Sequence, residues 1–254
     1  SWSFVAMERS VAAESRRRGC AALYRIYWFL TLDIGMHLLI KLFASILRIK
    51  RLVHFLFRWI VHACVFPRWV VVDRSDRALV MKHALFRHLE LEVFVARSQV
   101  VEAARFVAEI VRLADDAEYR LPAATHEKLQ AAGLLASLEP IKGRFTHHYP
   151  ITFRRVLPDD TLISMASGST EDWYAISFIT YVEPREDFFA LATFLANSMF
   201  ELFQGRIHWG KWFPQTSDHV NQLYPKIDTF RDVCSRYDPN GVFRNRFIEN
   251  KLGL

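Results

Sequence analysis

The stretch RHLELEVFVARSQVVEAARFVAEIVRLAD, residues 87–115, decides the fold class. Leucine and valine alternate with other side chains from Leu89 to Val95, which is typical of a half-buried antiparallel strand. After a capping Ser98 the period changes, and apolar residues recur at helical spacing as far as Asp115. A strand with one apolar face, followed at once by a helix with one apolar face, predicts a helix packed on a sheet.

The remainder of the chain contains the same two kinds of element without strict alternation. We expect further strands at 145–157, 161–166 and 173–182, and helices at 186–204 and 217–237. The stripe of helix 98–115 that we expect to be buried is Val100, Val101, Ala104, Val107, Ala108 and Val111. This order predicts an α+β fold, in which helices cover one face of an antiparallel sheet.

The basic residues are concentrated at the N-terminal end. Residues 1–66 hold ten Lys and Arg and three acidic residues, so they carry +7, and the remaining 188 residues sum to about −1. Their apolar runs predict two amphipathic helices near 22–47 and 50–65. Charged residues interrupt these runs every seven to ten positions, which argues against a membrane span.

Three roles fit the basic segment 1–66. Its apolar faces can pack on the rest of the protein, or the helices can lie on an anionic membrane surface. Nucleic-acid binding has only the charge in its favour, so we expect no nucleic-acid partner. Three widely spaced cysteines, Cys20, Cys64 and Cys234, favour a reducing compartment. We therefore expect a cytoplasmic protein, with association at the cytoplasmic face of a membrane as the variant.

The sequence offers little support for a nucleotide cradle or a metal site. Glycine is scarce, with nine residues, and neither GxGxxG nor a Walker loop is present. His147 and His148 are neighbours on an expected strand, so they point to opposite faces and cannot easily bind one ion. We expect no metal. The charged face of strand 87–96, with His88, Glu90 and Glu92, is expected to be solvated or paired more often than to line a site.

Two patterns are suited to substrate chemistry. In His208-Trp209-Gly210-Lys211, an imidazole and an ammonium three residues apart can face one pocket and hold a hydroxylated or carbonyl-bearing substrate. The same four residues would also suit an ordinary surface loop with a solvated lysine. On strand 145–157, Thr152, Arg154 and Val156 share one face. Arg154 either presents a rigid cation to a substrate or forms a salt bridge at a strand edge.

The order HWGK at 208–211, Tyr224-Pro225, then DPNGVFRN at 238–245 resembles the C-terminal end of the sugar-1,4-lactone oxidases. This group includes D-arabinono-1,4-lactone oxidase, L-gulonolactone oxidase and alditol oxidase, and belongs to the FAD-dependent vanillyl-alcohol-oxidase superfamily. Arg154 matches the family's strand arginine. The pair Asp159-Asp160 matches its acidic pair, and Ser164 matches its serine. Thr152 stands where the family usually has glutamate.

The resemblance implies a substrate (cap) domain over residues 67–254, whose partner, the flavin-binding domain, is not in this chain. It implies that Arg154, Lys211 and His208 are catalytic and that Asn245 lies near the cofactor. The implied reaction is oxidation of a sugar lactone or polyol, with hydride transfer to FAD and electrons passed to oxygen or another acceptor. Alone, the chain would not turn over.

A different class of function also fits the chain. The α+β body with its basic helices could be a non-catalytic module that binds a membrane surface or a partner protein, and the missing nucleotide loops are compatible with this. The retained HWGK motif and the Arg154 strand argue against it, because a binding module has no need of them.

Overall fold

The computed structural model describes residues 15–61, 71, 73, 77, 87–168 and 170–254, without the side chains of residues 15–20 and of Leu32. The chain divides into two compact units, Ser1–Arg87 and His88–Leu254. The expected domain boundary after residue 66 falls outside the described residues and stays a prediction.

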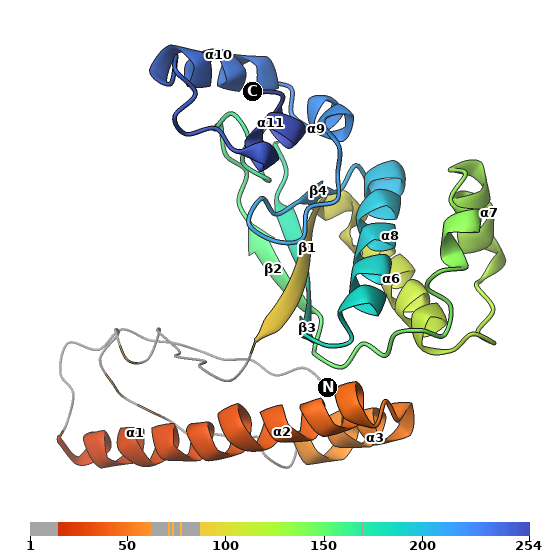
Figure 1. Cartoon of the computed structure of the whole chain (residues 1–254), viewed down its shortest axis with the longest axis vertical. Coiled ribbons are helices and arrows are strands. Elements are labelled where there is room, and N and C mark those ends of the chain that lie inside the picture. Colours follow the sequence, from red (N-terminus) through yellow and green to blue (C-terminus); the bar gives the residue numbers. More distant parts are fainter. Residues whose placement is uncertain (1–14, 62–70, 72, 74–76, 78–86, 169) are drawn as a thin grey trace. The chain divides into compact units, whose positions relative to one another are not determined.

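Residues 15–61 of the first unit form one long helix and one shorter helix (Figure 1). The long helix is continuous through α1 Ser15–Trp28, the π-helical η1 Phe29–Met36, α2 His37–Ile40 and the π-helical η2 Lys41–Ile46. It ends at Arg48, whose left-handed φ of 50° turns the chain. The second helix consists of α3 Lys50–Phe55 and η3 Leu56–Ile60. These two helices agree with the segments expected near 22–47 and 50–65, the last residues of which lie outside the description.

The second unit is built on a four-stranded antiparallel sheet, with strand order β2-β3-β1-β4 (Figure 1). The strands are β1 His88–Ala96, β2 Thr152–Val156, β3 Trp173–Tyr181 and β4 Arg206–Ile207. The two long central strands pair along their whole length, from His88 opposite Tyr181 to Ala96 opposite Trp173. The expected α+β fold with an antiparallel sheet is confirmed.

Two helices, α6 Val100–Asp115 and α8 Arg185–Phe203, provide the apolar cover of the sheet. Leu91, Val93, Ile176 and Phe178, all from one face of β1 and β3, are buried with them in the main core. Each large apolar side chain buried in this way stabilises the fold by about 1.5–3 kcal/mol. The opposite face of the sheet has a smaller apolar cluster, which includes Phe94, Trp173 and Ala175, and beside it a group of polar residues.

The expected buried stripe of helix α6 is wrong for most of its residues. Val101 is 60% exposed, whereas Phe106, Ile110 and Leu113 are buried. The helix carries two overlapping apolar stripes, and the one with the larger side chains turns toward the sheet because it removes more apolar surface from water. The side chains that are buried are those of Ala103, Phe106, Val107, Ile110, Leu113 and Ala114.

Three other expected elements also differ. The expected strand 145–157 begins only at Thr152, because residues 145–151 are not in a strand. The expected helix 217–237 is two helices, α9 Ser217–Leu223 and α10 Ile227–Tyr237, because Pro225 cannot continue a helix. The expected strand 161–166 is a turn-rich loop, in which side chains of Asp159 and Ser164 bind nearby backbone N–H groups. The remaining short elements are η4 Arg97–Gln99, α7 Ala123–Ala131, η5 Leu135–Leu138 and α11 Arg246–Leu252.

Candidate functional site

The face of the sheet opposite the main core carries a row of polar residues from three strands. Glu92 on β1 lies opposite Ser177 on β3, and Ser177 lies opposite Thr152 on β2. Because side chains alternate along a strand, Glu90 and Arg154, two residues away from this row, point to the same face. The strand alternation seen in the sequence therefore places both glutamates and Arg154 together.

Arg154 is held on this face by two hydrogen bonds. Its Nη1 donates to Glu92 Oε1 at 2.9 Å and to Ser177 Oγ at 2.9 Å. The Glu92 side chain is only 7% exposed, while that of Arg154 is 54% exposed. One side of the guanidinium is thus anchored by a buried carboxylate, and the rest of the planar fork faces outward, where it can bind a ligand.

The HWGK segment is attached to the edge of the same sheet. The N–H of His208 donates to the Glu92 carbonyl at 3.0 Å, and the N–H of Trp212 donates to the Glu90 carbonyl at 3.1 Å. These bonds extend the pairing of β4 with β1 beyond Ile207. The side chain of Lys211 forms an ion pair with the Glu90 carboxylate, which is 7% exposed. The two cations of the site, Arg154 and Lys211, therefore each have a buried carboxylate from the same strand.

Gly205 makes this attachment possible. A Cβ at this position would lie 3.0 Å from both the Met199 carbonyl oxygen and Val93 Cγ1, which is too close for any larger residue without movement of the backbone. The preceding Gln204 ends α8 with a left-handed φ of 51°. The helix end and the edge strand can pack this closely only because residue 205 has no side chain.

His208 lies beside Phe94, with 6.2 Å between the ring centroids. Its Nδ1 accepts a hydrogen bond from the N–H of Gly210 at 3.0 Å. The neutral ring therefore carries its proton on Nε2, which is left as a donor.

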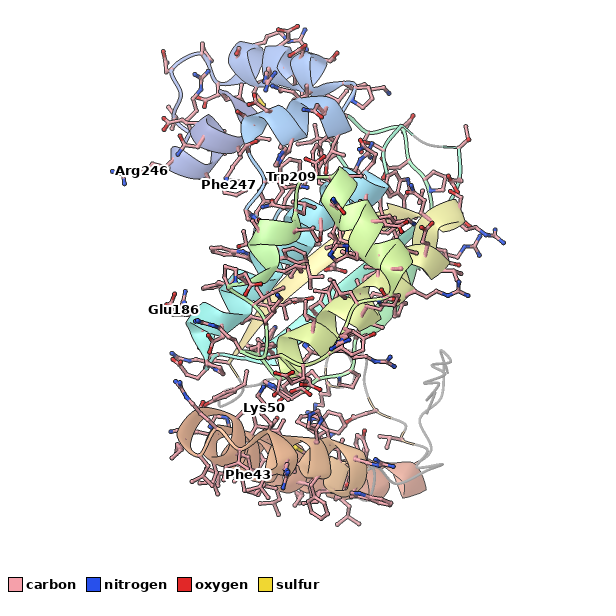
Figure 2. The ribbon with its side chains drawn as sticks, turned by 90° about the vertical axis from the view of Figure 1, so that its right-hand side faces the viewer. Phe43, Lys50, Glu186, Trp209, Arg246 and Phe247 are labelled. Carbon is pink, nitrogen blue, oxygen red and sulfur yellow. The ribbon has the colours of Figure 1, made fainter. Side chains whose placement is uncertain are left out.

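Trp209 has a structural role in the motif. Its Nε1 donates to the Ile163 carbonyl at 2.8 Å, and its ring stacks on Phe213 with centroids 4.8 Å apart. Phe213 in turn meets Phe247 of α11 edge-on, and Figure 2 shows Trp209 and Phe247 in this region. Trp209 therefore fixes the HWGK loop to the loop after β2.

Thr152 adds an unusual polar atom to the site. Its Oγ1 is buried and has no hydrogen-bond partner among the described residues. A buried hydroxyl without a partner costs free energy, and because almost none of this oxygen is exposed, a ligand could reach it only if its neighbours moved.

Other residues singled out by the sequence have local structural roles. Asn245 caps α11, because its Oδ1 accepts hydrogen bonds from the N–H groups of Phe247 and Ile248, both at 3.0 Å. Burial acts to raise the pKa of Asp159, but hydrogen bonds from Ser164 and Thr161 outweigh it and hold that pKa below its usual value. The proximity of Asn245 to a cofactor stays a prediction.

The paired histidines before β2 are buried and neutral. Burial, with the neighbouring imidazole, lowers the pKa of His147 to about 3, and burial lowers the pKa of His148 to about 4. The Nε2 of His148 accepts from the Tyr181 N–H at 3.2 Å, and its Nδ1 lies 3.0 Å from the Thr146 carbonyl. This ring joins the incoming chain to the end of β3. Among the described residues, no group of three or more His, Cys, Asp and Glu side chains could hold a metal ion.

Comparison with known proteins identifies the family of the chain. A family model described as D-arabinono-1,4-lactone oxidase matches residues 10–251. The chain belongs to this family. A long-chain alcohol oxidase from an uncultured marine euryarchaeote is 44% identical over 246 residues, which cover 96% of this chain and 51% of that protein.

Other relatives match a smaller part of the chain. L-gulono-1,4-lactone dehydrogenase of Mycobacterium tuberculosis is 32% identical over 105 residues, covering 41% of this chain and 23% of that protein. Alditol oxidase of Streptomyces sp. is 30% identical over 99 residues, covering 39% of this chain and 23% of that protein. The chain thus spans about half the length of the long-chain alcohol oxidase, and its matches to these two relatives cover about a quarter of theirs.

For this member of the D-arabinono-1,4-lactone oxidase family, sequence reasoning underestimated Glu90 and Glu92. They were expected to be solvated or paired, and they are paired, but with Lys211 and Arg154, and both carboxylates are almost fully buried. The signal was present in the sequence, because two glutamates at i and i+2 on a strand share a face. The sequence does not give the strand order, which puts β3 and then β2 on one side of β1 and the HWGK segment on the other.

Proposed function

We propose that this chain is the substrate-binding part of an FAD-dependent oxidoreductase that oxidises a hydroxylated carbon of a sugar lactone or polyol. The observation that carries the proposal is the pair of cations on one sheet face, Arg154 held by Glu92 and Lys211 held by Glu90. Membership of the lactone oxidase family supports the reaction class.

Arg154 is the part of the polar row that a substrate with several hydroxyl groups can reach. Its side chain is 54% exposed, whereas Glu92 and Ser177, which hold its guanidinium, are buried. The planar fork offers several N–H donors to substrate oxygens. Hydrogen bonds from a site built in this way favour substrates with matching oxygens over analogues that lack them.

The charged residues can position the reacting carbon. In this proposal the outward side of the Arg154 guanidinium and the Nε2–H of His208 bind substrate oxygens, while Lys211 orients the hydroxyl that is oxidised. A fixed guanidinium also stabilises negative charge that develops nearby. Bound FAD would supply the acceptor for the hydride from that carbon.

The residues of this chain fit only one part of that cofactor. The cations on the sheet face suit the flavin ring, which becomes electron-rich on reduction, and the substrate beside it. Because the sequence has no glycine-rich phosphate-binding motif, we assign the phosphates of FAD to the flavin-binding domain of the complete protein. The electron acceptor, oxygen or another molecule, remains open in this proposal.

A second substrate class is favoured by one observation. The relative that matches 96% of the chain, and therefore most of the N-terminal helical unit, is named a long-chain alcohol oxidase. A long-chain alcohol would present its one hydroxyl to the same cations but would have no further oxygens for the Arg154 fork to bind.

The test uses the protein that joins this chain to its flavin-binding domain. The bound flavin is mixed without oxygen with L-gulono-1,4-lactone, with xylitol and with 1-dodecanol, and its absorption is followed. Reduction by the lactone or by xylitol, slowed in Lys211→Ala but unchanged in the surface variant Lys128→Ala, supports the proposal. Reduction by 1-dodecanol alone selects the second substrate class, and no reduction by any of the three refutes both.

A further inference from the structure

The long helix of the first unit exposes an apolar stripe, which we define as Ile26, Leu30, Leu38, Leu42 and Ile46. These side chains are 40% to 64% exposed. They recur at intervals of four residues, with the half-buried Ile34 in the gap. Large aliphatic side chains gathered in this way mark a surface that binds an apolar partner.

The winding of the helix keeps this stripe straight. In a regular α-helix with 3.6 residues per turn, residues four apart drift by about 40° at each step, so the stripe would wind around the helix. Here the π-helical segments Phe29–Met36 and Lys41–Ile46 have wider turns, which offset the drift. The opposite side of the helix contains the buried residues Ala21, Met36 and Ile40. The helix therefore has one buried side and one exposed apolar side.

The segment that carries the stripe is strongly basic. Between Ser15 and Val61 the sequence has nine Lys and Arg and a single acid, Asp33, which is buried. Arg25, which pairs with Asp73, and Lys41 are exposed on the long helix, and Arg51 and Arg58 are exposed on the second helix. Long basic side chains at the edge of an apolar stripe can keep their charge in water while their stems cover apolar surface.

The second helix adds an aromatic anchor. Trp59 is 60% exposed and Phe55 is 52% exposed. The guanidinium of Arg58 lies 5.6 Å from the centroid of the Trp59 ring. Tryptophan beside arginine suits the boundary between lipid chains and headgroups, where one end of the side chain is dry and the other wet.

We propose that residues Ser15–Ile60 bind the surface of a membrane rich in anionic phospholipid, with the long helix lying in the membrane plane and the apolar stripe buried among the lipid chains. Charge complementarity selects this partner, because the segment carries +8, nine basic residues against one acid. The proposal does not depend on the proposed enzymatic function.

The in-plane orientation follows from the position of Asp33. Among the described residues, one helix, Ala21–Ile46, is long and apolar enough to cross a membrane by length and composition. The charged residues that interrupt the apolar runs therefore do not by themselves exclude a membrane span. In a span, however, Asp33 would lie at the middle of the helix and so at the depth where a carboxylate is most costly. Lying in the plane, the helix keeps Asp33 on the side away from the lipid chains.

The first test measures sedimentation of the chain with vesicles of phosphatidylcholine, with and without 30 mol% phosphatidylserine (about the anionic fraction of a cytoplasmic leaflet). We expect binding to the anionic vesicles that weakens as salt is added. The variant Leu30→Asn/Leu38→Asn should bind more weakly by a factor of about ten or more, since each substitution removes most of the favourable free energy of transferring a leucine side chain from water into the lipid. The variant Lys41→Gln/Arg51→Gln should lose about fivefold for each charge on anionic vesicles only.

The matched control is Val101→Asn/Leu157→Asn, which removes two aliphatic side chains of similar exposure, 60% and 65%, from the second unit. Its vesicle binding should equal that of the unchanged chain. Equal binding of all variants, or no binding to either vesicle, overturns the proposal.

Two further outcomes would each replace the proposal of in-plane membrane binding with a different one. If the bound protein resists extraction by alkaline carbonate and is released only by detergent, the helix spans the membrane and the in-plane orientation is wrong. If the chain ignores vesicles but forms a dimer that Leu30→Asn/Leu38→Asn dissociates, the stripe is an interface between copies of the chain. Release by carbonate together with a monomer in solution supports the proposal.

Discussion

Arg206 is a buried cation, 6% exposed, that links three parts of the second unit. Its Nη1 donates to the Ser167 carbonyl and its Nη2 to the Leu223 carbonyl, both at 2.7 Å. Its guanidinium carbon lies 4.6 Å from the centroid of the Trp173 ring and 4.7 Å from that of Tyr224. One side chain of β4 thus holds the loop after β2 and the end of α9 beside the candidate site.

Replacement of Arg206 by methionine keeps much of the volume and removes the charge. Two short hydrogen bonds from a charged donor are lost, at about 1.5–3 kcal/mol each, and two buried carbonyls lose their donor. Two cation–π contacts are lost as well, at about 1–2 kcal/mol each. Against this, burial disfavours the arginine charge and lowers the pKa of Arg206, and that cost disappears. We expect a net loss of about 3–5 kcal/mol in the free energy of unfolding.

The assay is urea unfolding of the chain followed by tryptophan fluorescence. The control is Arg155→Met, since Arg155 is 59% exposed and its Nε pairs with Asp172 at 2.8 Å. An exposed pair of this kind contributes under about 1 kcal/mol. A loss for Arg206→Met no larger than for this control would show that the buried contacts of Arg206 do not stabilise the unit.

The remaining predictions concern the site and the pH dependence of stability. In the complete enzyme, Arg154→Ala and Lys211→Ala should each lower kcat/KM by about tenfold or more, and unchanged kinetics in a folded variant would contradict the site assignment. Thr152→Glu should change the relative kcat/KM for lactones and polyols, and an unaltered substrate profile would contradict the position given to residue 152. His147 and His148 have pKa values of about 3 and about 4 in the folded chain, below the usual 6.5. Their stabilising contribution is therefore complete above pH 6.5 and falls by about 1.4 kcal/mol per pH unit for each histidine as the pH drops toward 4, which urea titrations at several pH values would detect.

The sequence predicted the elements whose pattern is carried by many residues. Strand 87–96 and strand 173–182 agree with β1 and β3 within a residue at each end, because both are long and flanked by clear turns. Helix 186–204 agrees equally well with α8. The errors occurred where a single residue determines the local structure. One proline divides α9 from α10, and hydrogen bonds of single side chains turn 161–166 into a loop.

The cations of the candidate site could be predicted from the sequence, but the carboxylates that pair with them could not. Arg154, Lys211 and His208 were selected from motifs, and the structure brings all three to one face of the sheet. Their catalytic roles stay predictions. Which carboxylate holds which cation depends on strand pairing between residues more than sixty positions apart, and a single sequence contains no such information.

Glu90 and Glu92 alternate on β1 with Leu89, Leu91 and Val93, so the register of this strand determines both the apolar core and the candidate site. A slip of β1 by one residue would bury both carboxylates in the apolar core and turn the leucines and valines outward. Such a slipped chain would lose its core and its candidate site at the same time, so a well-folded chain is expected to have Arg154 and Lys211 correctly placed as well.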